Sequence, residues 1–150
     1  MTILHGMRRS LRRTWLLLLL PSAAGIAASE SARTLGGFQG WNVPGRESLQ
    51  VVLFIAAAAT SLALPILYRA AFASAHRKRS GVPVGMFYRF ANNSIVISLL
   101  TPYFSLAASL LGFAPFHTVG IFLLTLYAVY TQFPSLARLE SDMRTFRVET

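Results

Sequence analysis

Two neighbouring apolar segments decide the fold: residues 90–113 read FANNSIVISLLTPYFSLAASLLGF, and residues 115–133 read PFHTVGIFLLTLYAVYTQF. Neither segment contains Asp, Glu, Lys or Arg. A helix needs about 20 mostly apolar residues to cross the roughly 30 Å of hydrocarbon in a bilayer. Both segments therefore predict transmembrane helices. Because the connection between them is so short, we expect these helices to be antiparallel neighbours.

Two further apolar segments precede this pair. Residues 49–68, LQVVLFIAAAATSLALPILY, predict another transmembrane helix. Residues 14–28 are apolar but short, are interrupted by Pro21 and follow a basic N-terminus at residues 1–13. This layout is typical of a cleaved signal peptide and also of an uncleaved signal anchor, which we favour.

The predicted fold class is therefore all-α. We expect a polytopic membrane helical bundle that forms a single integral membrane domain over residues 1–150. It has four transmembrane helices, or three if residues 14–28 are a cleaved signal peptide.

The distribution of basic residues predicts the orientation of this bundle. The chain has 14 Lys+Arg against 5 Asp+Glu, and with four spans all of the basic residues except Arg33 and Arg46 fall on one side. Lysine and arginine mark the cytoplasmic side. We therefore expect a protein of the bacterial inner membrane with both termini in the cytoplasm. The basic charge is explained by topology, so the expected partners are the lipid bilayer and other membrane subunits or a second copy, and not nucleic acid.

Composition excludes several classes of protein. Only 13% of the residues are charged, whereas an ordinary soluble domain has about 25%. The chain has no cysteine, which excludes disulfides, thiolate metal sites and cysteine nucleophiles. Its three histidines, His5, His76 and His117, share neither a helix nor a membrane depth, which argues against a bis-histidine haem. Motifs of common soluble enzymes are absent, and we expect no cofactor, metal or catalytic residue.

Small and hydroxyl-bearing residues recur every three or four positions along residues 94–112 and 118–132, and so form one stripe on each helix. Such residues let helix backbones approach closely in lipid and add modest interhelical hydrogen bonds. We favour a packing seam, and the alternative is a hydrated pore lined by the same residues in an assembly of several subunits. The candidates for helix packing or pore lining are Ser94, Ser98, Thr101, Ser105, Gly112, Thr118, Thr125 and Gln132.

Three prolines, Pro65, Pro102 and Pro134, are predicted to kink or end the helices that contain them, because proline removes a backbone hydrogen bond. Asn92 and Asn93 lie at the start of the third long segment, and we expect them to cap or anchor its inner end.

The inner face carries two further features. Its candidates for lipid or partner contact are Arg77, Lys78, Arg79 and Arg89. Residues 135–150 predict an amphipathic inner tail, with Ser135 as the cap of a short helix. Apolar residues recur at helical spacing on one face of this tail. We expect it to lie on the inner membrane surface or to dock onto a cytosolic partner; the apolar residues are Leu136, Leu139, Met143 and Phe146.

Three functional hypotheses follow. The favoured one is an accessory or assembly subunit of a membrane complex, or a structural homo-oligomer. The first alternative is a small transporter, channel or holin-like pore, suggested by the kinks and the hydroxyl stripe. The least favoured is a membrane-embedded redox or lipid enzyme that uses His117 or residues 101–103.

Overall fold

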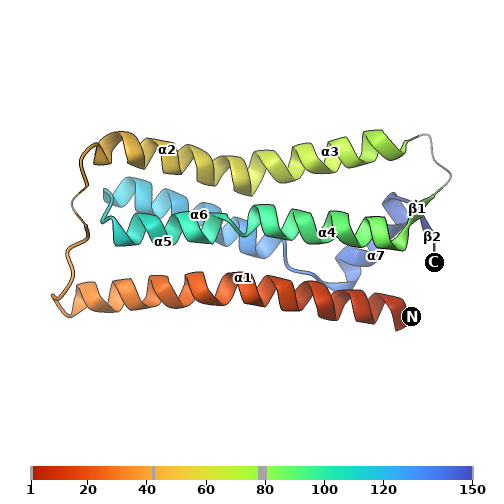
Figure 1. Ribbon diagram of the computed structural model, residues 1–150, viewed down its shortest axis with the longest axis horizontal. Coiled ribbons are helices and arrows are strands. Elements are labelled where there is room, and N and C mark those ends of the chain that lie inside the picture. The colour runs from red at the N-terminus through yellow and green to blue at the C-terminus, as the bar shows by residue number, and fades with distance from the viewer. Residues whose placement is uncertain (1, 42, 78–80, 150) are drawn as a thin grey trace.

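The computed structural model describes residues 2–41, 43–77 and 81–149, and these residues form an all-helical bundle (Figure 1). Two very short parallel strands pair Val82 with Val148 near the chain ends. The elements in chain order are α1 (Thr2–Thr34), α2 (Arg46–Ala58), the π-helical turn η1 (Ala59–Ala63), α3 (Leu64–His76), β1 (Val82–Pro83), α4 (Val84–Ser98), α5 (Thr101–Leu110), α6 (Pro115–Thr131), α7 (Leu136–Thr145) and β2 (Val148–Glu149).

The predicted all-α fold class is confirmed. Three helical stretches are long and apolar enough to cross a membrane: Leu4–Thr34, Arg46–His76 and Val84–Leu110. A fourth stretch meets the same criteria only if α6 and α7 are taken together, and these two helices are bent by 75° relative to each other.

The helix formed by α4 and α5 is the centre of the bundle. It contacts α1 on one side and α2, η1, α3 and α6 on the other (Figure 1). One end of the bundle, which we call the basic end, contains the N-terminus, the two strands and α7. The connection from α1 to α2 and the turn from α5 to α6 lie at the opposite end.

The first apolar segment belongs to one continuous 33-residue helix, α1. Our expectation that Pro21 interrupts it is wrong, because the helix runs through Pro21. Two side-chain hydroxyls bond to backbone in the turn before Pro21: Tyr103 Oη donates to the carbonyl of Leu18, and Ser22 Oγ donates to the carbonyl of Leu19, each at 2.9 Å. At about 1.5 Å per residue, α1 is roughly 50 Å long.

Changes in helical geometry occur at the three predicted kink positions. Pro65 lies in the first turn of α3, directly after the π-helical turn η1. Pro102 lies in the first turn of α5, and Leu99 and Leu100 separate α4 from α5. Pro134 is buried in the bend between α6 and α7. Pro65 and Pro102 thus lie where the geometry of a long helical stretch changes, and Pro134 lies where α6 has ended.

The third spanning stretch begins earlier than the sequence suggests, at Val84. Asn92 and Asn93 therefore lie inside α4, and the expectation that they cap its inner end is wrong. Asn93 instead links two helices, since its Nδ2 donates to Tyr68 Oη on α3 at 3.2 Å.

The tail forms helix α7, and Ser135 is its N-cap as predicted, with Oγ accepting from Arg138 N at 3.2 Å. The apolar face of α7 is covered by the chain itself. Leu139, Met143 and Phe146 are buried in one cluster with Met7 and Leu11 of α1 and with residues of α4. Our expectation that this face meets the membrane surface or a cytosolic partner is therefore corrected: it packs against the basic end of the bundle.

Candidate functional site

The predicted hydroxyl stripe lies in the interior of the bundle, where α2, η1, α5 and α6 meet. Thr101 and Thr60 are both buried, and their hydroxyl oxygens are 2.9 Å apart. Thr125 on α6 donates to Ile121 O at 3.0 Å and lies 3.4 Å from Thr101 O. The structure therefore brings Thr101 and Thr125 together with Thr60, which was not among the predicted site residues.

Other members of the stripe have different surroundings. Ser98 and Ser105 are buried, and among the described residues Ser98 Oγ has no hydrogen-bond partner. Ser94 donates to the Oε1 of the buried Gln132 over 3.4 Å, which links α4 to the end of α6. Thr118 is half-buried at the opposite end of the bundle and donates to Phe113 O at 3.4 Å.

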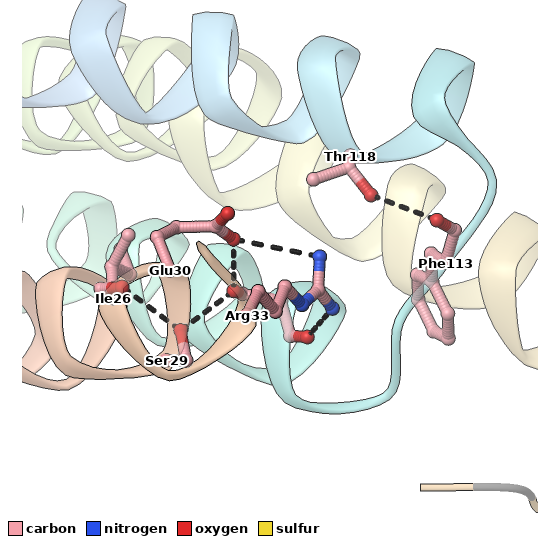
Figure 2. A network of polar contacts seen from close by, with 7 residues as sticks. Ile26, Ser29, Glu30, Arg33, Phe113 and Thr118 are labelled. Atoms are coloured by element: carbon pink, nitrogen blue, oxygen red, sulfur yellow. Dashed lines mark hydrogen bonds and ion pairs between the residues drawn. The ribbon is translucent and has the colours of Figure 1, made fainter. Parts of the chain in front are cut away.

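A polar network ties α1 to the C-terminal end of α5 (Figure 2). Ser109 Oγ lies 2.7 Å from Ser29 Oγ and donates to Glu30 Oε1 at 2.6 Å. Arg33 Nη1 lies 3.5 Å from Glu30 Oε1, and the two side chains point toward each other in Figure 2. Arg33 Nη2 also donates to the carbonyl of Ser109. A guanidinium at the negative end of a helix dipole stabilises that end, so this network holds the bundle together at the end opposite the basic end.

The predicted packing residue Gly112 lies in the turn after α5, with φ of +59°. A Cβ atom on Gly40 would lie 2.9 Å from the Cα atom of Gly112. Trp41 N donates to Leu110 O at 3.1 Å in the same place. The connection after α1 therefore runs directly over the α5–α6 turn, and this close backbone approach requires glycine.

A cavity of about 180 Å³ lies at the basic end, between η1, α3, α4, α6 and α7. Polar groups from η1 and from the four helices α3, α4, α6 and α7 reach it, and Pro65 and Pro134 also line it. The polar and charged lining residues are Ser61, Arg69, Ser94, Tyr127, Thr131, Gln132, Arg138 and Asp142.

Two arginines at this cavity share one carboxylate. Arg69 Nη2 lies 2.6 Å from Asp142 Oδ1, and Arg138 Nε lies 3.9 Å from Asp142 Oδ2. The guanidinium of Arg69 also lies 5.5 Å from the centre of the Phe146 ring, within range of a cation–π contact. Burial lowers the pKa of the Arg138 guanidinium, while Asp142 raises it and Arg69 lowers it. Both arginines stay charged at neutral pH, so the group carries one net positive charge.

In the sequence Arg138 and Asp142 are four residues apart in the predicted tail, whereas Arg69 directly follows the predicted span 49–68. Nothing in the sequence pattern pairs Arg69 with Asp142, which are 73 positions apart. The only available signal was that both residues were predicted on the same side of the membrane.

The predicted basic contact residues lie outside this cavity. Arg77 follows the end of α3 and Arg89 lies on α4, and both are exposed. Lys78 and Arg79 lie outside the described residues. Arg77 and Arg89 thus do not line the cavity that Arg69 and Arg138 reach.

Candidate metal ligands do not converge in the part of the chain that the structure describes. No group of three His, Cys, Asp or Glu side chains that could hold a metal ion occurs there. His117 is half-buried at the start of α6 with its ring near those of Phe54 and Phe116, and its Nδ1 has no hydrogen-bond partner among the described residues.

Comparison of the chain with protein-family models, with curated proteins and with solved structures found no match. Function therefore has to be inferred from the fold and from the geometry of these sites.

Proposed function

We propose that this chain is a small multi-pass protein of the bacterial inner membrane with a structural role, as an accessory or assembly subunit of a larger complex or as a homo-oligomer. In this proposal α1 is retained as the first span, and the basic end faces the cytoplasm. Retention of α1 is supported by Met7 and Leu11, which are buried in the same cluster as α7.

The observation that carries the proposal is the composition of the exposed face of α1. Along the C-terminal part of α1 this face carries small residues, because Ala23, Ala24, Ala27, Ala28 and Ser31 are all exposed. Nearer the middle of the helix, α1 also exposes the large side chains of Leu17 and Leu20. Small residues on a membrane helix let a second helix approach closely, and they are enriched at helix–helix interfaces.

Much of the other outward surface differs, although the C-terminal half of α3 also exposes small residues: Ala70, Ala71, Ala73, Ser74 and Ala75. The outward faces of α2, the N-terminal half of α3 and α6 present large apolar side chains, among them Ile55, Ile66, Leu67, Phe122 and Leu123. Large apolar residues are suited to lipid, whereas the face of α1 favours contact with another helix.

The interior of the bundle supports the same proposal. Its hydroxyls bond across helices within one chain, as between Thr60 and Thr101, and this is the arrangement expected of a packing seam. The pore and enzyme hypotheses stay predictions.

Cross-linking in the membrane tests the proposal, because the chain contains no cysteine and a single new thiol can be labelled. Ala24→Cys carries a photoactivated cross-linker on the small face, and Ala63→Cys carries it on an exposed position of η1. We expect irradiation of Ala24→Cys to give a stoichiometric adduct with a second protein chain. We expect Ala63→Cys to give lipid adducts.

A second substitution provides the control. Ala28→Leu, added to Ala24→Cys, fills the space that a neighbouring helix would occupy, and the protein adduct should be lost. Lipid adducts alone at both cysteine positions would contradict the proposal.

A further inference from the structure

We propose that the cavity at the basic end binds the phosphate headgroup of an anionic phospholipid, taken from the leaflet that faces this end. The inference goes beyond the structural role proposed above and does not require a protein partner.

The first argument is charge. Arg69 and Arg138 both approach Asp142, whose single carboxylate neutralises only one of the two guanidiniums. The side chain of Asp142 is only 15% exposed, whereas those of Arg69 and Arg138 are 45% and 36% exposed. The accessible part of the group is therefore cationic. A phosphodiester with one negative charge complements it, and guanidinium groups bind phosphate oxygens with well-defined geometry.

The second argument is the neutral polar lining of the cavity. Ser94, Thr131 and Gln132 lie beside the two arginines in its wall. The hydroxyls of Ser94 and Thr131 already donate within the chain, to Gln132 Oε1 and to Tyr127 O. The amide nitrogen of Gln132 can supply N–H donors to a headgroup without adding charge. A cavity of about 180 Å³ has room for several water-sized groups, as a phosphate with its substituents requires.

The third argument separates a lipid from a free anion. The wall of the cavity continues from Arg69 to Ile66 and Leu62, and these apolar side chains are 64% and 37% exposed on the outer surface of the bundle. Arg69 and Leu62 are seven residues apart, which corresponds to about 10 Å along a helix. A charged site at the membrane boundary thus opens onto an apolar surface that runs toward the bilayer interior. An amphiphile fits this arrangement, with its headgroup at the arginines and an acyl chain along Ile66 and Leu62.

Basic pockets between membrane helices are a general mode of headgroup recognition. This site differs from the predicted basic contact residues, because its arginines come from α3 and α7 and are brought together by the fold.

The test is native mass spectrometry of the full-length protein from micelles that contain phosphatidylglycerol and phosphatidylcholine in equal amounts. We expect the wild type to retain one phosphatidylglycerol selectively. R69Q/R138Q should lower this retention roughly tenfold or more, because each basic residue contributes substantially to binding of anionic lipid. The control R144Q/R147Q removes the same charge from exposed positions near the same end and should retain the lipid.

Two further measurements keep the result decisive. D142N removes the carboxylate that competes for the arginines, so it should increase phosphatidylglycerol retention, and this variant decides the question if R69Q/R138Q does not fold. In the second measurement, inorganic phosphate is added at millimolar concentration to the wild-type protein with its bound phosphatidylglycerol, and displacement of the lipid is followed.

Three results would overturn the proposal. Equal retention of the two lipids would exclude recognition of the headgroup charge. Equal losses in R69Q/R138Q and R144Q/R147Q would show general charge attraction. Complete displacement by inorganic phosphate would identify a site for free phosphate instead of a lipid.

Discussion

Two buried hydroxyls that lie three residues apart on the central helix have opposite environments. Thr101 Oγ1 is 2.9 Å from Thr60 Oγ1 on η1, whereas Ser98 Oγ has no partner among the described residues. A hydrogen bond between membrane helices contributes on average about 0.6 kcal/mol. A buried hydroxyl without a partner costs free energy instead. The two positions should therefore respond differently to removal of the hydroxyl.

We predict that Ser98→Ala leaves the free energy of unfolding unchanged or raises it by up to about 1 kcal/mol. Thr101→Val, which keeps the shape of the side chain, should lower it by about 0.5–1 kcal/mol. Unfolding in mixed micelles of mild detergent and dodecyl sulfate, followed by circular dichroism, measures both changes. A larger loss for Ser98→Ala than for Thr101→Val would mean that Ser98 has a polar role that this structure does not explain.

The sequence spacing placed Ser98, Thr101 and Ser105 on one helix face, and all three are buried. It did not identify their partners, because Thr60 and Thr101 come together only when η1 packs beside the break between α4 and α5. Whether this face acts as a seam or lines a pore stays a prediction.

Helix α7 shows what an amphipathic pattern does and does not reveal. Its cap at Ser135 and its apolar face could be read from the sequence, because both are local properties of the chain. The surface that covers this face could not be predicted from the sequence, because the cluster around Phe146 also contains Phe72, Phe87 and Phe90 from two other helices. Pro21 illustrates the same limit, since the hydroxyl of Tyr103 that supports the helix near it comes from 85 positions away.

We predict that Phe146→Ala releases α7 from the basic end of the bundle. Loss of a buried phenylalanine costs about 3–5 kcal/mol, and α7 is a short helix whose docking depends on this cluster. Limited trypsin digestion of the purified protein measures the release, because α7 contains Arg138 and Arg144. Cleavage in α7 should be at least several-fold faster in Phe146→Ala than in the wild type.

Glu140→Ala is the matched control for this experiment, because Glu140 lies on the exposed face of α7. Its cleavage rate should equal that of the wild type. Equal rates for all three proteins would show that the aromatic cluster does not hold α7 in place.

For the whole molecule, length and apolar composition predicted an all-α bundle with three or four helices long enough to span a membrane, because these properties depend on segments and not on contacts. The three-dimensional arrangement adds two features. The chain ends, the strands and α7 gather at one end (Figure 1), and the C-terminal part of α1 turns a face of small residues outward. Such a face is the surface on which another helix would pack.

The mass of the native protein in mild detergent, with identification of everything that co-purifies, tests the proposed structural role most directly. The chain has a mass of 16.5 kDa, and we predict a larger particle that contains either stoichiometric foreign subunits or several copies of this chain. Ala24→Leu/Ala28→Leu should convert it to the single chain, because bulky side chains prevent close helix approach. Ala63→Leu should leave it intact. A wild-type protein that is a stable monomer with no protein partner would contradict the account.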